Sequence, residues 1–121
     1  MLYLGNAFSP SMLPDTPGGV SVHFAELNLG KVKELLNNGN FVSAVGHQST
    51  ADFISMLVGV SVPANRTSIK LQYGDELLVL QLMSRLPEGV VLSKEEVEKV
   101  PHKWYLVRLL PPYTLEAVYH W

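Results

Sequence analysis

The sequence has no cysteine among its 121 residues. This absence excludes disulfide cross-links, thiol nucleophiles and cysteine-ligated zinc. The four histidines do not stand at the spacing to one another, or to carboxylates, that a metal site requires; they are His23, His47, His102 and His120. We therefore expect no metal and no other cofactor.

Long apolar runs and a large excess of one charge are also missing. No hydrophobic stretch reaches the length of about 18 residues that crosses a bilayer, and the first residues lack the basic start of a signal peptide. We expect a cytoplasmic protein, in the host cytoplasm if it is viral, with no membrane partner. The formal net charge of −2 argues against a long nucleic acid as partner. A small anion held by a few arginines stays possible.

Common catalytic motifs are absent as well. The sequence contains no P-loop, no GxGxxG fingerprint, no paired-histidine zinc motif and no Gly-x-Ser-x-Gly elbow. What it does contain is enough apolar residues for a core, because 47% of the chain is hydrophobic. Length and composition indicate one domain over residues 1–110, followed by an aromatic-rich C-terminal tail over residues 111–121.

Strand-like and helix-like segments alternate along the chain. The patterns predict strands over residues 1–8, 19–24, 41–45, 67–72, 76–83 and 104–110, and helices over residues 31–37, 49–59 and about 93–100. Tyr73-Gly74-Asp75 indicates a hairpin between residues 67–72 and 76–83. The expected fold class is α/β, with a mixed sheet of about five to six strands flanked by helices.

Two helices carry an N-terminal capping signature. Ser49 with Asp52, and Ser93 with Glu96, stand three residues apart, as in a capping box. We expect Ser49 and Ser93 to be the N-cap residues.

His47 is the strongest candidate for chemistry. It lies between a predicted strand and a predicted helix, where free N–H groups and the helix dipole favour an anion. Ser49 and Thr50 offer two further donors, and a histidine beside a phosphate is able to protonate a leaving oxygen near neutral pH. The alternative is a loop histidine bonded to the backbone, with Ser49 acting only as a cap. The pattern alone favours this alternative.

A second group of polar residues follows the predicted strand over residues 76–83. Alternation places Gln81 on the face opposite Leu80, where it could meet a polar ligand together with Arg85, while Glu88 orients one of these groups. The alternative is an edge-strand glutamine and a surface ion pair between Arg85 and Glu88, worth about 0–1 kcal/mol. Here too the pattern alone favours the simpler interpretation.

Three more residues are weaker candidates. Arg66 is either a phosphate clamp or a solvated turn residue, and Asn6 and Ser9 lie in a segment that would serve equally as a plain turn. None of these positions identifies a function by itself.

Taken together, four segments resemble the viral ring nucleases, which are type III anti-CRISPR proteins. They occur in the same order and at similar intervals in that family: Asn6-Ala7-Phe8-Ser9, Gly46-His47-Gln48-Ser49-Thr50, Asn65-Arg66, and Gln81 to Gly89. The resemblance covers roughly residues 3–110. Two positions depart from the family pattern, because Ser11 stands where relatives often carry Asn, and Gln48 where Asp is common.

The resemblance implies a homodimer that binds cyclic tetra-adenylate across its interface. It further implies cleavage of this RNA ring to linear products that end in a 2′,3′-cyclic phosphate, which silences the messenger of type III CRISPR immunity. By the same resemblance His47 is the general acid, and Arg85 and Glu88 lie in the active site. The matching ligand-contacting positions are Asn6, Ser9, Ser11, Ser49, Thr50, Arg66 and Gln81.

Such a reaction suits these residue types. The ribose 2′-hydroxyl supplies the nucleophile, so the protein has to align the ring, steady the charge on phosphate and protonate the leaving 5′-oxygen. Two other classes stay open: a sponge or sensor that binds the ring without cutting it, and a regulatory or protein-interaction module that uses the aromatic tail.

Overall fold

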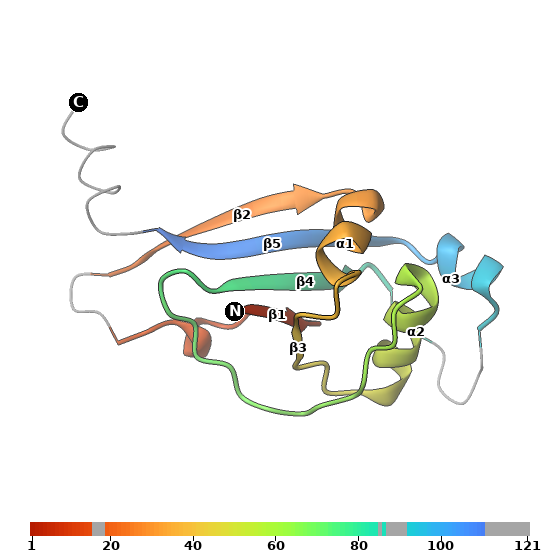
Figure 1. The fold of residues 1–121 in the computed structure, drawn as a ribbon, viewed down its shortest axis with the longest axis horizontal. Helices are drawn as coiled ribbons and strands as arrows, with labels where there is room; N and C mark the ends of the chain where they lie inside the picture. The colour runs from red at the N-terminus through yellow and green to blue at the C-terminus, as the bar shows by residue number, and fades with distance from the viewer. Residues whose placement is uncertain (16–18, 85, 87–91, 111–121) are drawn as a thin grey trace.

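The computed structural model describes residues 1–15, 19–84, 86 and 92–110. In these residues five strands form one mixed sheet in the order β2-β5-β4-β1-β3 (Figure 1). The strands are β1 (Leu2–Gly5), β2 (Ser21–Leu27), β3 (Val42–Ser43), β4 (Glu76–Leu82) and β5 (His102–Leu110). β1 runs parallel to β3 and β4, whereas β5 runs antiparallel to β2 and β4. The expected single-domain α/β fold with a mixed sheet is confirmed. The described residues contain no helix long and apolar enough to cross a membrane.

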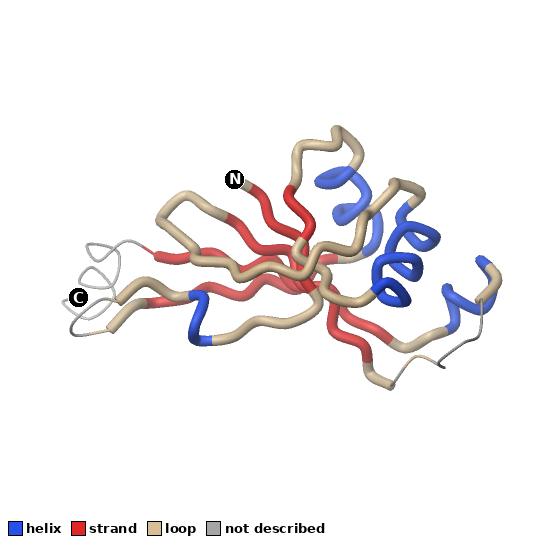
Figure 2. Tube along the Cα trace, turned by 90° about the horizontal axis from the view of Figure 1, so that it is seen from below, coloured by secondary structure: helices blue, strands red, loops and turns tan. Residues whose placement is uncertain are grey.

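Helices α1 (Leu29–Leu36) and α2 (Gln48–Val58) lie on one face of the sheet, α3 (Lys94–Lys99) lies next to α2 beyond the end of the strands, and a short 3₁₀ helix, η1 at Pro10–Met12, lies on the other face (Figure 2). Strand β4 separates two cores, because Leu78 and Leu80 pack under the helices while Leu77 and Val79 pack on the opposite side. A strand buried on both faces reads as a continuous apolar run, as Leu77–Leu80 does.

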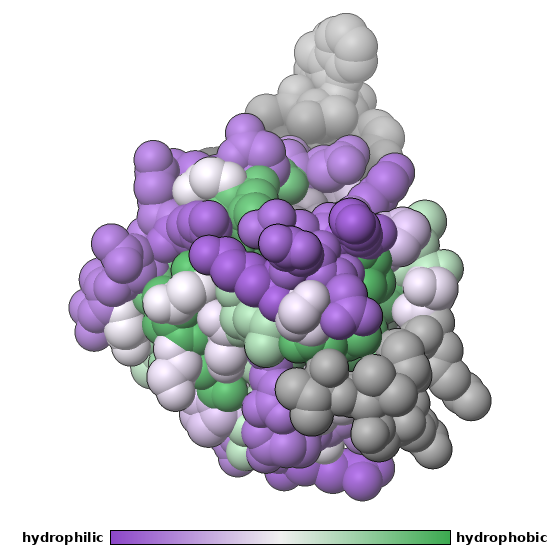
Figure 3. Space-filling view, turned by 90° about the vertical axis from the view of Figure 1, so that its right-hand side faces the viewer, coloured by the Kyte–Doolittle hydropathy of each residue, from purple (hydrophilic) through white to green (hydrophobic). Residues whose placement is uncertain are grey.

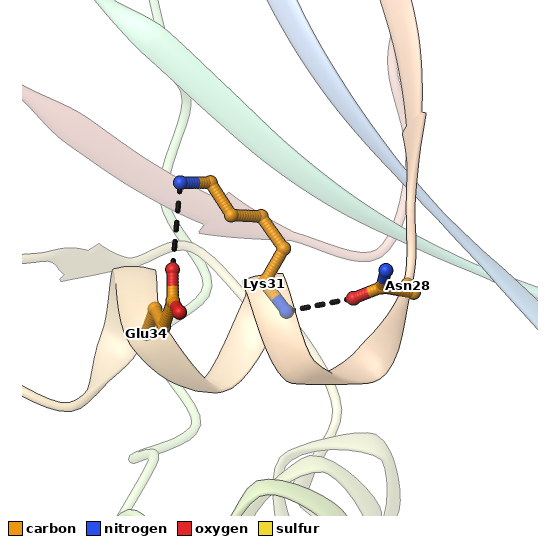
Figure 4. A network of polar contacts seen from close by, with 3 residues as sticks. All are labelled: Asn28, Lys31 and Glu34. Carbon is orange, nitrogen blue, oxygen red and sulfur yellow. Dashed lines mark hydrogen bonds and ion pairs between the residues drawn. The ribbon is translucent and has the colours of Figure 1, made fainter.

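Helix α1 starts on an asparagine cap. The Asn28 Oδ1 atom accepts a 2.9 Å hydrogen bond from the Lys31 backbone N–H, and the Lys31 ammonium lies 3.5 Å from Glu34 on the next turn (Figure 4). Such a cap satisfies one of the free N–H groups of the first turn. Val32 and Leu36 then point into the core between the helices and the sheet, which also contains Leu78 and Leu80.

The predicted capping box of α3 is confirmed in both of its bonds. The Ser93 hydroxyl accepts from the Glu96 backbone N–H at 3.2 Å, and the Glu96 carboxylate accepts from the Ser93 N–H at 3.1 Å. Val97 is the buried residue of this short helix. Hydrophilic side chains cover much of the end of the molecule where α2 and α3 lie, with apolar ones showing between them (Figure 3).

The predicted strand over residues 67–72 and its hairpin are wrong. The turn exists, because the Asp75 N–H donates to the Gln72 carbonyl at 3.0 Å and Gly74 has a φ of 95°. However, both edges of β4 are taken by β1 and β5. Residues 67–72 instead cross the face away from the helices, where Ile69 and Leu71 pack against the sheet. An alternating pattern fits a segment lying on a sheet as well as one lying in it.

Candidate functional site

The parallel strands bring three candidate segments to one edge of the sheet. β1, β3 and β4 run in the same direction, so Asn6, His47 and Gln81 all lie at or just beyond the carboxyl end of a strand. In open α/β sheets this edge is the usual place for a ligand. The register pairs Gly5 with Val79, which places Asn6 and Gln81 close together.

His47 is the N-cap of α2. Its backbone is extended, with φ −126° and ψ 135°, and its carbonyl accepts the Ala51 N–H at 3.0 Å. The imidazole is exposed and makes no capping hydrogen bond. Because the first N–H groups of a helix have no intrahelical acceptor, the side chain of His47 stands beside free donors at the positive end of the dipole.

The prediction that Ser49 caps this helix with Asp52 is wrong. Ser49 is the second residue of α2, and Asp52 accepts instead from the Gln48 side-chain amide at 2.8 Å. Thr50 and Ala51, which follow Ser49 in the first turn, are both buried. A local capping pattern, typically worth about 1 kcal/mol, does not by itself fix where a packed helix begins. The Ser49 hydroxyl is consequently left exposed and uninvolved in capping.

The start of α2 and the end of β4 line an open hollow of about 600 Å³, which we name the His47 hollow. Its lining residues are His47, Ser49, Thr50, Leu82, Met83, Ser84 and Leu86. An imidazole, three hydroxyl side chains and the first turn of a helix therefore line one space. Thr50 is only 6% exposed and thus has a fixed position, whereas Met83 is 56% exposed.

Arg66 lies against the residue that precedes His47. A Cβ atom placed on Gly46 would lie 3.6 Å from Cγ of Arg66, so the arginine stem rests on the bare backbone of Gly46. Arg66 is exposed and makes no ion pair with the residues that the structure describes. A cation without an internal partner is free to meet an anionic ligand.

The predicted catalytic residues Arg85 and Glu88 lie outside the described residues. Their assigned roles stay predictions. Ser84 and Leu86, on either side of position 85 in the sequence, both line the His47 hollow.

Asn6 and Gln81 line a second cavity, of about 530 Å³, which we name the Gln81 hollow. Its lining residues are Asn6, Ala7, Phe8, Phe24, Val79, Leu80, Gln81, Leu82 and Tyr105. Leu82 lines both hollows, but Phe8 and Val79 of the Gln81 hollow belong to the core away from the helices, whereas Leu86 of the His47 hollow packs under the helices. The prediction that Gln81 shares a face with Val79, opposite Leu80, agrees with the packing of those two neighbours in different cores. Gln81 itself is exposed.

Ser9 and Ser11 lie in and around η1. Ser9 is its N-cap, and the two hydroxyl oxygens are 3.0 Å apart. Ser11 lines a third cavity, of about 380 Å³, with Thr67, Ser68 and Lys70, whose ammonium donates to the Ser11 carbonyl at 3.4 Å. These serines are thus paired with each other and with a lysine.

Two kinds of lining residue escaped the sequence analysis. Lys70 lies between the buried residues Ile69 and Leu71. This alternation of apolar and polar residues could have predicted that the Lys70 side chain faces outward. Phe8, in the segment after β1, and Phe24 of β2 form an edge-to-face pair with ring centroids 5.3 Å apart. Nothing local in the sequence indicates such a contact.

In the described part of the chain, no three His, Cys, Asp or Glu residues gather as a metal-binding group. The arrangement offers an imidazole and hydroxyl groups around the His47 hollow, a guanidinium stem against Gly46, and amides and aromatic rings around the Gln81 hollow. This set of groups suits a ligand that carries both phosphate and a flat ring system.

The fold and site define a small α/β protein with its polar groups at the carboxyl edge of a mixed sheet. The family sequence model described as STIV B116-like matches residues 2–104, and the chain belongs to this family. The solved structure of B116 of Sulfolobus turreted icosahedral virus is similar, with a TM-score of 0.77 and 31% identity, covering 88% of this chain and 97% of that one.

Relatives occur in viruses and in a bacterium. Uncharacterized protein 26 of Sulfolobus islandicus filamentous virus (isolate Iceland/Hveragerdi) is 40% identical over 112 residues, which cover 91% of this chain and 92% of the relative. The protein YddF of Bacillus subtilis (strain 168) is 30% identical over 106 residues, covering 86% and 96%.

Proposed function

We propose that the protein is a metal-independent ring nuclease. It binds cyclic tetra-adenylate across a homodimer and cuts the ring to linear products that end in a 2′,3′-cyclic phosphate, acting in the host cytoplasm against type III CRISPR immunity. The observation that carries the proposal is the exposed His47 imidazole at the N-terminus of α2, with Ser49 and Thr50 in the same hollow and Arg66 against Gly46.

The proposed reaction uses the nucleophile of the RNA itself. The ribose 2′-oxygen bonds to the adjacent phosphorus and its proton passes to solvent, while the bond from phosphorus to the 5′-oxygen breaks. His47 donates a proton to this leaving oxygen. Arg66 and the N–H groups of the first turn of α2 stabilise the charge on the phosphoryl oxygens. Arg85 and Glu88 complete the proposed site.

The size of the ligand supports a shared site. Four nucleotides arranged in a ring have repeating phosphates, and a two-fold homodimer presents each binding group twice. Both hollows include Leu82 at the end of β4, and we assign a phosphate of the ring to the His47 hollow and a base to the Gln81 hollow. Asn6 and Gln81 offer amide groups there, beside aromatic walls.

The test is cleavage of radiolabelled cyclic tetra-adenylate by purified protein in EDTA, beside His47→Ala. We expect linear products with the wild type and an intact but bound ring with the variant. Rings of three and six adenylates, run in parallel, report the preferred size. A ring that the wild type neither binds nor cuts would overturn the proposal.

A binding-only role is the second candidate. Its support is that Gln48 and Ser11, the two departures from the family pattern, are both engaged inside the chain, with Asp52 and Ser9 respectively. A sponge would shift the ring in a native gel and release it whole, so the same assay separates the two roles.

A further inference from the structure

The segment that carries Arg66 is fastened to the exit of β3 by three hydrogen bonds. The Asn65 side-chain amide donates to the Ser43 carbonyl at 2.6 Å, and the Asn65 backbone N–H donates to the Val45 carbonyl at 2.8 Å. The Ser43 hydroxyl donates to the Pro63 carbonyl at 2.7 Å. We name these contacts the Asn65 clasp.

The clasp is anchored on the sheet. Ser43 is 5% exposed and pairs with Leu4 of β1, and the neighbouring Ala44 N–H donates to the Leu4 carbonyl at 2.7 Å. The Ser43 hydroxyl also accepts from the Val45 N–H at 3.3 Å. The bonds of Asn65 therefore end on a rigid strand pair rather than on another loop.

Both site residues lie close in sequence to the two segments that the clasp joins. Arg66 is the residue after Asn65, and His47 is the second residue after Val45. Asn65 bonds to residues 43 and 45, the next residue Gly46 lies under the stem of Arg66, and His47 comes after Gly46. A long, exposed arginine has many rotamers in solution. Holding its backbone and stem in place leaves the guanidinium fewer positions to sample beside the imidazole.

We infer that Asn65 is a positioning residue, which sets the place of Arg66 relative to His47. This inference rests on the proposed function, in which Arg66 binds the phosphate whose leaving oxygen His47 protonates. If Asn65 had a purely structural role, it would stabilise the loop, and its substitution would not change the cleavage rate through Arg66.

The experiment is a double-mutant cycle on cleavage of cyclic tetra-adenylate under single-turnover conditions. The proteins are wild type, Asn65→Ala, Arg66→Ala and the double variant. We expect Asn65→Ala to lower the rate by about tenfold to a hundredfold, the range for a misplaced group. In the double variant, loss of the amide should add no more than about twofold to the loss from Arg66→Ala, because the residue it positions is gone.

Two further variants keep the result interpretable. Asn40→Ala changes an exposed asparagine outside the clasp, and should cleave like the wild type. Gly46→Leu removes none of the hydrogen-bonding groups of the clasp and adds a branched side chain where a Cβ atom alone would already contact Cγ of Arg66 at 3.6 Å. If Asn65→Ala does not fold, this variant should show the same loss of rate. Thermal unfolding by circular dichroism identifies the variants that are folded.

The outcomes separate the two proposals. Fully additive losses in the cycle, or wild-type rates in both Asn65→Ala and Gly46→Leu, would overturn the positioning role while leaving the ring nuclease in place. An inactive, non-binding wild type removes the proposed function, and this inference with it.

Discussion

At the scale of single residues, the site depends on where α2 begins. The sequence pattern predicted Ser49 as the N-cap, whereas the structure has His47 as the N-cap and Gln48 as the first helical residue. His47 therefore lies next to the free N–H groups of the first turn, because the helix begins two residues earlier than predicted. This shift strengthens the anion-binding character of the position.

We predict that His47→Ala lowers ring cleavage by about 10²–10⁴-fold, the usual contribution of a general acid. Binding of the intact ring should persist, because Ser49, Thr50 and Arg66 are unchanged. The measurement is a single-turnover rate together with a native gel shift. Gln48→Ala, which changes the neighbouring exposed residue, is the matched control for helix integrity. Equal rates for His47→Ala and wild type would exclude His47 as the acid.

The contact of Arg66 with Gly46, the residue before His47, does not follow from any local pattern in the sequence, although the family resemblance assigns Arg66 and His47 to the same site. The two residues are far apart along the chain, and the bonds that join their segments run between Ser43, Val45, Pro63 and Asn65. The face of Gln81, by contrast, followed from simple alternation along β4. Local periodicity is visible in a sequence, whereas a contact between loops depends on the tertiary fold.

At the scale of helices and strands, a feature could be predicted from the sequence when the residues that form it are close together in the chain. The capping box of α3 was predicted correctly because Ser93 and Glu96 are three residues apart. The hairpin before β4 was predicted wrongly because the neighbours of that strand come from distant parts of the chain. The segment over residues 67–72 shows an alternating pattern because one of its sides lies flat on the sheet.

This packing predicts a large stability cost for Leu71→Ala. Leu71 is fully buried against the sheet, and its N–H donates to the Met12 carbonyl at 2.7 Å. We expect a loss of about 2–5 kcal/mol in the free energy of unfolding, measured by urea denaturation. Gln72→Ala, at the exposed neighbouring position, should change it by no more than about 0.5 kcal/mol. Similar losses for both would show that the segment is not packed as described.

The capping box also predicts a pH dependence. Hydrogen bonds from the Ser93 backbone and hydroxyl, together with the charge of Lys99, lower the pKa of Glu96 in the folded protein. A lowered pKa contributes stability that is complete above the unfolded pKa and is lost as the pH falls through the folded value. Glu96→Gln removes this contribution, so we expect a smaller drop in Tm on acidification than in the wild type. The same dependence of Tm on pH in the wild type and in Glu96→Gln would contradict this prediction.

At the scale of the whole molecule, the proposed site requires two copies of the chain. A ring of four nucleotides is larger than either hollow, and two-fold symmetry would supply a second His47 and a second Arg66. We predict that light scattering of the wild type gives twice the monomer mass of 13.4 kDa. A strict monomer at micromolar concentration, with or without the ring, would remove the shared site.

One leucine has a consequence for how this molecule can change. Leu82 at the end of β4 lines both the His47 hollow and the Gln81 hollow. A substitution there changes the lining of both hollows at once, so under the proposed function it should alter ring preference and cleavage rate together. Phe8 and Phe24 line the Gln81 hollow and not the His47 hollow, so their substitution leaves the lining around His47 as it is.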